Sequence, residues 1–318
     1  MQRRDFLIRS TSLAALACFP AFGAQNFTIY GAPAMITLPL AYARHHGQAR
    51  KVKDFSLRVW NSPDELRAGF VSGSYQLSCA PMNVGVILAH KGLNIKLLSV
   101  LTNGLNYILS RNDNIKELKD LEGKKLIIPF KNDLPDFVFS ALCDKLGVKK
   151  SKIDIHYVQT PPQAAQLFVA KGEFDAVLSQ EPFSSAVMLL GKKHGVKVQR
   201  AIDIQALFKA SFGVGVKQAG MVVNGEFYAK NQPFFEALSG DLTEAVEWIK
   251  SHETSAASLG ARYLPAPEPA IKMAIRHSNL IYAKAGEVYA ELNEFYKIIF
   301  AQNRDFLGGK MPSRELFL

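Results

Sequence analysis

The fold is decided first by a stretch near the start of the chain, FTIYGAPAMITLPLAYARHHG, at residues 27–47. Its first four residues have the apolar character of a strand, and Gly31 with the following Ala-Pro interrupts that strand. Apolar residues then recur at helical spacing until His46 and Gly47, a pair that is typical of a helix end. The stretch therefore predicts a strand followed by a helix.

The same alternation continues to about residue 100. Strands are expected at 55–60, 76–80 and 95–100, and the helices between them end at Gly73 and Gly92. Ser62 and Pro63 open the first of these helices, with Ser62 as its N-cap. A repeated strand–helix rhythm is typical of a parallel, doubly wound sheet, in which ligands bind at the carboxyl ends of the strands.

The rhythm restarts after residue 105, which indicates a second α/β unit. Strands are expected at 106–110, 125–129, 153–158, 174–179 and 196–201, with one further strand at 221–224. Beyond that strand only helices are expected, at 232–251, 254–263, 267–276 and 283–300. We expect this helical tail to pack on the first unit.

Length and composition fit an ordinary globular protein of two domains. The chain has 318 residues, 48% of them hydrophobic, and about 100–200 residues per domain is usual. Three cysteines exclude a disulfide scaffold, and no Cys/His cluster has zinc-site spacing. The net charge of +10 is spread along the chain, so we do not expect nucleic-acid binding. No metal or other cofactor is expected.

The first 23 residues have the three parts of an export signal. A basic start, MQRRDFLIRS, precedes an apolar stretch at 13–22 that is about half as long as a membrane span. Ala21 and Gly23 are small residues at the positions that a signal peptidase requires, so cleavage is expected after Gly23.

The export route has two alternatives. Arg3-Arg4 partly matches the twin-arginine motif, and general secretion is the other route. A lipid anchor at Cys18 is not expected. The mature protein is therefore expected to be soluble and periplasmic.

Several motifs occur in an order that resembles one family of periplasmic substrate-binding proteins. They are the Gly31-Ala32-Pro33 turn, the Trp60-Asn61-Ser62-Pro63 corner, KDLEGKK at 119–125, and GEFDAV at 172–177 leading to Glu181-Pro182. Together they are similar to the nitrate/sulfonate/taurine and thiamine-precursor group, the NMT1-like family, whose members deliver solutes to ABC importers. The resemblance covers about residues 27–300.

The resemblance implies an α/β protein with the type II periplasmic binding protein fold, in which two doubly wound lobes are joined by two crossover strands. Residues 24–107 and 212–318 would form lobe one with its helical tail, and residues 108–211 lobe two. The crossovers are expected near 106–110 and 208–216. A ligand clamped between the lobes would close them by a hinge motion. A monomer is expected, with the membrane permease and ATPase of an importer as partners.

We expect ligand contacts at the corners where strands meet helices, because the first N–H groups of each helix lack partners there. The candidates from lobe one are Pro33, Ala34, Met35, Trp60, Asn61, Ser62, Met82 and Asn83. The candidates from lobe two are Lys131, Asn132, Asp133, Gln180 and Glu181.

Each candidate also has a purely structural interpretation. Ser62 and Asp133 can be helix caps, and Trp60 can be a core residue rather than a ring that stacks on the ligand. Glu181 is the strongest candidate, because a carboxylate at the end of an apolar strand is costly unless it is paired or bound. Asp133 and Glu181 favour a small organic ligand with N–H donors, such as an aminopyrimidine. Lys131 and the positive net charge leave an anion such as a sulfonate or nitrate as the alternative.

Two other classes of function compete with solute binding for an ABC importer. An enzyme on the same fold would need a catalytic set, but the seven histidines are scattered and no GxSxG motif is present. No catalytic residue is therefore expected. An exported sensor or accessory protein would use the same cleft to present its ligand to a membrane receptor, and only its partners would distinguish it.

Overall fold

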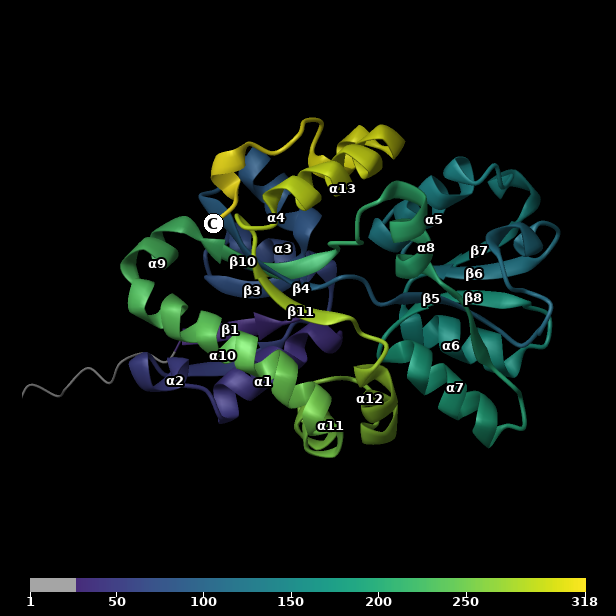
Figure 1. Cartoon of the computed structure of the whole chain (residues 1–318), viewed down its shortest axis with the longest axis horizontal. Helices are drawn as coiled ribbons and strands as arrows, with labels where there is room; N and C mark the ends of the chain where they lie inside the picture. The colour runs from purple at the N-terminus through teal and green to yellow at the C-terminus, as the bar shows by residue number, and fades with distance from the viewer. Residues whose placement is uncertain (1–26) are drawn as a thin grey trace, which may run out of the picture.

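The computed structural model describes residues 27–318. The predicted export signal, with Arg3-Arg4, the cleavage position after Gly23 and Cys18, lies outside the described residues. Two β-sheets, each with helices on both faces, form two lobes that lie side by side (Figure 1). The predicted pair of α/β lobes is therefore confirmed.

The first sheet has six strands in the order β11-β4-β10-β3-β1-β2. β1 pairs in parallel with β2 and β3, whereas β10 lies antiparallel between β3 and β4, and β11 lies antiparallel beside β4. The predicted parallel pairing is confirmed for β1, β2 and β3 and is wrong for β10 and β11. β10 is antiparallel because the chain returns from the second lobe and enters the sheet from the opposite end. The strands are β1 (Phe27–Gly31), β2 (Phe55–Val59), β3 (Leu77–Pro81), β4 (Ile95–Thr102), β10 (Ala219–Asn224) and β11 (Leu280–Lys284).

The second sheet has five strands in the order β7-β6-β8-β5-β9. β6 pairs in parallel with β7 and β8, and β5 lies antiparallel between β8 and β9. The predicted strand at 106–110 is confirmed as β5, and the strand expected at 196–201 starts later, as β9. The strands are β5 (Asn106–Ser110), β6 (Lys125–Pro129), β7 (Asp154–Val158), β8 (Ala176–Gln180) and β9 (Gln199–Asp203).

Helices cover both sheets (Figure 1). Those around the first sheet are α1 (Leu38–His45), α2 (Ala49–Val52), α3 (Pro63–Val71), α4 (Met82–His90), α9 (Gly225–Lys230), α10 (Gln232–Ser251), α11 (Glu253–Gly260), α12 (Glu268–Ile275) and α13 (Tyr289–Gln302). Those around the second sheet are α5 (Leu134–Lys145), α6 (Pro161–Ala170), α7 (Phe183–Lys193) and α8 (Ile204–Phe212). No helix within residues 27–318 is long and apolar enough to cross a membrane.

The C-terminal part holds a strand that the sequence did not predict. β11 reads LIYAK, and α13 starts only at Tyr289, although a helix was expected from residue 283. The hydrophobic pattern of so short an apolar segment fits a strand and a helix equally well. Residues 280–284 form a strand because they pair with the edge of β4. The tail packs on the first lobe where α10 meets α1, but α13 also contacts α5 of the second lobe. The prediction that the C-terminal tail packs on the first lobe is therefore correct for α10 but incomplete for α13.

Two connections join the lobes. The first runs from the end of β4 through Asn103 into β5. The second leaves α8 at Gly213, whose φ of +77° is the left-handed conformation that ends many helices, and reaches β10 at Ala219. The crossover expected at 208–216 is therefore helical up to Phe212. The Asp203 side chain, which accepts a hydrogen bond from the backbone N–H of Ala206 at 2.9 Å, starts that helix.

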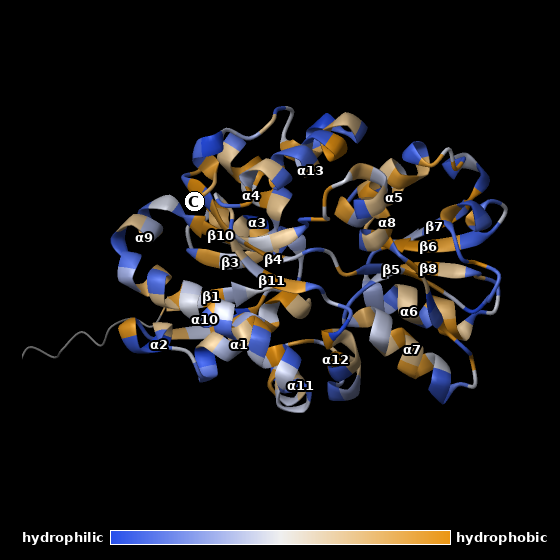
Figure 2. Ribbon diagram, viewed as in Figure 1, coloured by the Kyte–Doolittle hydropathy of each residue, from blue (hydrophilic) through white to orange (hydrophobic). Residues whose placement is uncertain are grey.

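Hydrophobic residues lie along the strands and on the inward faces of the helices (Figure 2). One cluster of buried side chains is continuous through both lobes, from Ile29 and Met221 in the first to Leu134 and Phe139 in the second. A smaller cluster around Phe168 lies on the other side of the second sheet. The contact between the lobes is therefore part of the apolar core.

Candidate functional site

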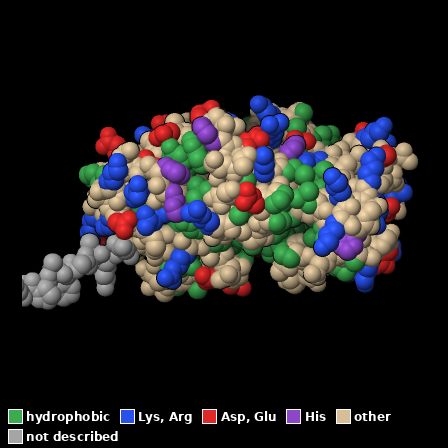
Figure 3. All heavy atoms as spheres, turned by 90° about the horizontal axis from the view of Figure 1, so that it is seen from below, with side chains coloured by type: hydrophobic (Ala, Val, Ile, Leu, Met, Phe, Trp, Pro, Cys, Tyr) green, Lys and Arg blue, Asp and Glu red, His purple; other side chains and the backbone are tan. Residues whose placement is uncertain are grey.

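The carboxyl ends of β1, β2, β3, β6 and β8 carry the predicted site residues. Figure 3 shows a notch between the two halves of the molecule, with hydrophobic side chains along its walls.

The corner after β1 is tightly folded. Gly31 is required here, because a Cβ would lie 2.5 Å from Cγ2 of Thr37, whose hydroxyl donates to the Ala32 carbonyl at 2.6 Å. Ala34 and Met35 are buried, and Pro33 is half-buried. The short 3-10 turn of Met35–Thr37 leads into α1. The side chains at this corner are therefore mainly apolar.

The Trp60 corner is a structural joint of the first lobe. The Trp60 side chain is only 6% exposed, its Nε1–H donates to the Cys79 carbonyl at 2.9 Å, and its backbone N–H donates to the Gly31 carbonyl at 3.1 Å. The ring thus ties together the ends of β1, β2 and β3. Trp60 is therefore packed as a core residue, and nothing in its surroundings supports stacking of the ring on a ligand.

Asn61 and Ser62 serve the start of α3. The Ser62 hydroxyl accepts from the Glu65 N–H at 3.1 Å, and Glu65 accepts in return from the backbone N–H and the side-chain amide of Asn61. These bonds, with a third from the Tyr75 hydroxyl, hold the pKa of Glu65 below its usual range. The predicted N-cap role of Ser62 is confirmed.

The corner after β3 contains an amide without a partner. Met82 is buried, and its N–H donates to the Gln218 carbonyl at 3.0 Å. Asn83, in the first turn of α4, is 7% exposed, and its Oδ1 accepts no hydrogen bond from any described residue. An unpartnered buried acceptor costs about 1–3 kcal/mol. Asn83 is therefore the candidate residue with a free hydrogen-bonding group.

The corner after β6 has a strained backbone. Phe130 and Asn132 have φ values of 60° and 61°, which are unusual for residues other than glycine and most unusual for a bulky one. Asp133 follows as the N-cap of α5, where its Oδ1 accepts from the Leu134 N–H at 2.8 Å. Strain of this kind is found most often at functional sites. Lys131 is exposed, and its Nζ lies 5.2 Å from the ring centre of Tyr157.

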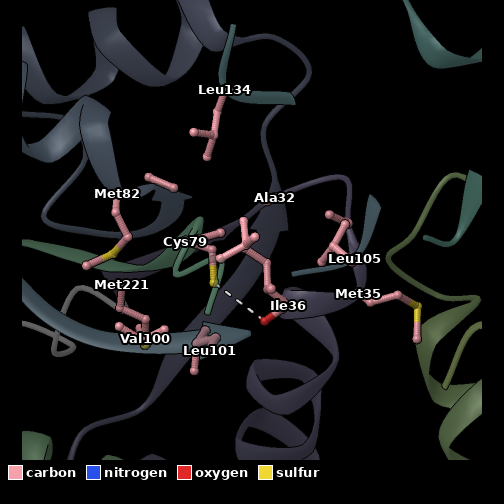
Figure 4. Packing of buried hydrophobic residues seen from close by; sticks show 14 of the residues in the cluster. Ala32, Met35, Ile36, Cys79, Met82, Val100, Leu101, Leu105, Leu134 and Met221 are labelled. Carbon is pink, nitrogen blue, oxygen red and sulfur yellow. Dashed lines mark hydrogen bonds between the residues drawn. The ribbon is translucent and has the colours of Figure 1, made fainter. Parts of the chain in front are cut away.

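The start of α5 faces the first lobe. Figure 4 shows Leu134 pointing toward Met82 and Ala32, and these side chains belong to one buried cluster. Burial raises the pKa of Asp133, while its bond to the Leu134 N–H and the charge of Arg67 on α3 act in the opposite direction. The structure thus brings Asp133 and Leu134 of the second lobe to the corners of the first.

At the corner after β8, both carboxylate oxygens of Glu181 are already hydrogen-bonded within the protein. The Glu181 side chain is fully buried, and Oε1 accepts from Nε and Nη2 of Arg200 at 2.9 and 2.5 Å. Oε2 accepts from the backbone N–H and the hydroxyl of Ser185 at 3.1 and 2.8 Å. Glu181 was expected to contact ligand because a buried carboxylate needs a partner, and Arg200 and Ser185 are those partners. Gln180 beside it is half-buried and pairs with Asn106 in the sheet.

Side-chain amides link the two connections between the lobes. The Asn106 side chain donates to Oε1 of Gln218 at 2.6 Å, and the Asn106 backbone N–H donates to Oε1 of Gln205 at 2.8 Å. The three residues are buried. They come from β5, α8 and the segment before β10, so no sequence spacing could have grouped them.

His277, which was not predicted from the sequence as a site residue, forms a contact between the lobes. The Tyr107 hydroxyl of β5 donates to the His277 carbonyl at 2.9 Å, and the two rings meet edge to face with centres 5.9 Å apart. Burial and the charges of Arg200 and Arg276 lower the pKa of His277 below its usual 6.5, against the opposite effect of Glu181 and Asp203.

This pKa shift predicts acid sensitivity. Because the folded state binds the His277 proton more weakly than the unfolded state does, the stability contributed by neutral His277 is lost as the pH falls through about 6.5. The variant His277→Gln cannot take up that proton. Urea unfolding followed across this pH range should therefore show a smaller acid-side loss of stability in the variant. Equal acid-side losses of stability in the variant and in the unmodified protein would contradict a lowered pKa of His277.

Among the described residues, no group of three or more His, Cys, Asp or Glu could hold a metal ion. The candidate site combines apolar side chains at the β1, β3 and β6 corners with two polar residues, Asn83 and Asp133. Trp60 and Glu181 support the corners, and Lys131 lies against Tyr157.

Comparison with known proteins gives one family match and many similar structures. A sequence model of the family described as NMT1/THI5 like matches residues 63–256. No protein with a curated functional description matches the chain.

The periplasmic aliphatic sulphonate binding protein SsuA from Escherichia coli is 20% identical, with a TM-score of 0.74 over 92% of this chain and 97% of its own. An ABC transporter from Parabacteroides distasonis is 19% identical, with a TM-score of 0.73 over 91% of this chain and 96% of its own. The alkanesulfonate-binding protein SsuA from Xanthomonas axonopodis pv. citri, bound to MOPS, is 16% identical, with a TM-score of 0.65 over 91% and 95%. These likenesses confirm the predicted type II periplasmic binding protein fold.

The family model spans more than half of the chain and includes α3, both connections and all of the second sheet. On this match, the chain belongs to the NMT1/THI5-like family.

Proposed function

We propose that the protein is the solute-binding component of an ABC importer and that it holds a small organic molecule between its two lobes. The family match, the two-lobed fold and the strand corners that meet between the lobes support this role. Residues 24–107 with 212–318 and residues 108–211 would be the two lobes. A periplasmic location and export by the signal at 1–23 would go with this function, as would monomeric action with a permease and an ATPase.

The unpartnered Oδ1 of Asn83 is the observation that most supports an organic ligand with N–H donors. It accepts no bond from residues 27–318, and Asn83 directly follows Met82, whose side chain belongs to the same buried apolar cluster as Ala32, Met35 and Leu134. Asp133 adds a second acceptor, because only its Oδ1 is used for the helix cap. Two acceptors beside apolar surface suit a ligand with N–H donors and an apolar ring, such as an aminopyrimidine, better than a sulfonate or nitrate.

A thermal-shift screen tests this function. Each ligand raises the apparent stability by RT ln(1 + [L]/Kd), which is about 2.7 kcal/mol at a hundredfold excess over Kd. The panel consists of aminopyrimidines, taurine, alkanesulfonates and nitrate, and we expect the aminopyrimidines to give the largest shift. A larger shift with nitrate or alkanesulfonates would overturn the ligand class and leave the binding function standing. Chemical conversion of a ligand that binds would contradict the function itself.

Asn83→Leu separates ligand binding from folding. Leu has a similar volume and removes the buried acceptor, so ligand-free stability should stay the same or rise by up to about 1–3 kcal/mol. The affinity for the N–H-bearing ligand should fall about tenfold, because one hydrogen bond of about 1–1.5 kcal/mol is lost. Urea unfolding and calorimetric titration measure the two effects on the same variant.

Asn293→Leu is the matched control, since this half-buried amide lies on α13 away from the strand corners. It should leave the affinity unchanged. Reduced stability with unchanged affinity in Asn83→Leu would show that the Asn83 amide supports the fold and would exclude it from the binding site.

A further inference from the structure

A pocket lies beside the two connections between the lobes, and its lining shares no residue with the strand corners of the proposed solute site. Its volume is about 320 Å³. Its polar lining comes from Asn103, Asp203, Gln205, Lys209, Lys217, Asn279 and Glu291. Figure 1 shows α8 next to α13 at the junction of the lobes, and the pocket lies between the start of α8 and this part of the first lobe.

Both lobes and both connections contribute to this pocket. Asp203 ends β9 and Lys209 lies on α8, so these two residues belong to the second lobe. Glu291 lies on α13 of the first lobe, while Asn103 and Lys217 lie in the two connecting segments. A molecule bound here would contact parts of the protein that change position relative to each other when the lobes close.

Two opposite charges in this pocket are unpaired within the described residues. Lys217 is already engaged, because its Nζ lies 2.7 Å from Oδ1 of Asn103 and 3.0 Å from Oε2 of Glu291. Lys209, by contrast, forms no ion pair with any residue of 27–318. Asp203 also forms none there, and only its Oδ1 is used, by the Ala206 N–H.

We propose that this hinge pocket binds a small zwitterion of the α-amino acid type, with its carboxylate at Lys209 and its ammonium at Asp203. A simple anion would meet the carboxylates of Asp203 and Glu291, and a simple cation would meet two lysines, so only a ligand with both charges is matched on both sides. The volume is at the lower end of the range of about 300–1,000 Å³ that is usual for small-molecule pockets, which fits a ligand of this size.

Such a ligand would act on the solute site through the hinge. Gly213 has a φ of +77° and Gly215 follows it closely, so the second connection is built from residues that change their backbone conformation easily. A zwitterion that contacts α8 and the segment before β10 stabilises one angle between the lobes. By linkage, it then changes the affinity for solute by the same factor as solute changes the affinity for the zwitterion.

The test is an amide NMR titration of the full mature protein with the standard α-amino acids, one at a time, and with acetate and methylammonium as single-charge controls. We expect at least one amino acid to shift the amide signals of Gly213, Gly215 and Lys217, and neither control to do so. Asp203→Asn keeps the helix cap and removes the charge, and Lys209→Gln removes the other charge. Each should weaken binding about tenfold or more, because a charge-assisted hydrogen bond is lost.

Lys193→Gln, an exposed lysine on α7, is the matched control and should bind as the unmodified protein does. The proposal is overturned if no amino acid shifts the Gly213 and Gly215 signals, or if acetate or methylammonium shifts them equally. It is also overturned if an amino acid shifts only Asn83 and Leu134. That last result would make the amino acid a ligand of the solute site, so the proposed function would stand while the hinge pocket failed.

Discussion

Replacing Glu181 by Ala is expected to lower the free energy of unfolding by about 3–5 kcal/mol, because it leaves a buried charge without its partner. The Arg200 side chain is only 12% exposed and Glu181 is fully buried, so water cannot replace the lost carboxylate. The change also removes Oε2, the single oxygen that accepts both hydrogen bonds of Ser185 at the start of α7. Urea unfolding of the ligand-free protein measures the loss.

Two further variants make the Glu181 test specific. Glu181→Ala combined with Arg200→Met removes both charges, so the double variant should be more stable than the sum of the two single losses predicts. Asp113→Ala breaks the exposed pair of Asp113 and Lys197, whose side chains are 62% and 70% exposed, and should cost no more than about 1 kcal/mol. If Glu181→Ala weakened solute binding at unchanged stability, Glu181 would be a ligand contact after all.

Trp60→Ala is expected to cost about 3–5 kcal/mol, as large-to-small changes of buried aromatic residues do. The ring fills the joint of β1, β2 and β3, and its loss also leaves the Cys79 carbonyl without the indole donor. Trp248→Ala, on the partly exposed face of α10, serves as the control and should cost less. A small loss of stability in Trp60→Ala, together with a large loss of solute affinity, would instead indicate a stacking role.

Local patterns in the sequence predicted most of the fold. The strand–helix rhythm locates β1 to β4 and β5 to β8, and the caps at Ser62 and Asp133 are formed as their residue types predict. β11 was missed because its strand state depends on pairing with β4, far away in sequence. Likewise, the antiparallel entry of β10 depends on the route of the chain between the lobes, which local periodicity does not contain.

The candidate site was less predictable, because it depends on contacts between distant residues. Glu181 was selected as a charge that needs a partner, but the partner, Arg200, lies in β9, and no spacing rule connects the two. The packing of Leu134 into the same buried cluster as Met82 depends on the angle between the lobes. Positions at strand ends can thus be found from the sequence, whereas the free or satisfied state of each polar group, as at Asn83, requires the full structure.

The strand order of the first sheet also determines when that sheet can be completed during synthesis. The second sheet uses one unbroken stretch, residues 106–203, whereas the first combines residues 27–102 with β10 and β11 from much later in the chain. Because chains are made from the N-terminus, the facing edges of β3 and β4 stay open until β10 emerges and fills the space between them. Open strand edges promote aggregation. The nascent protein therefore depends on late residues to close its earliest lobe, and truncation before residue 219 would leave the second lobe as the part able to form its complete sheet.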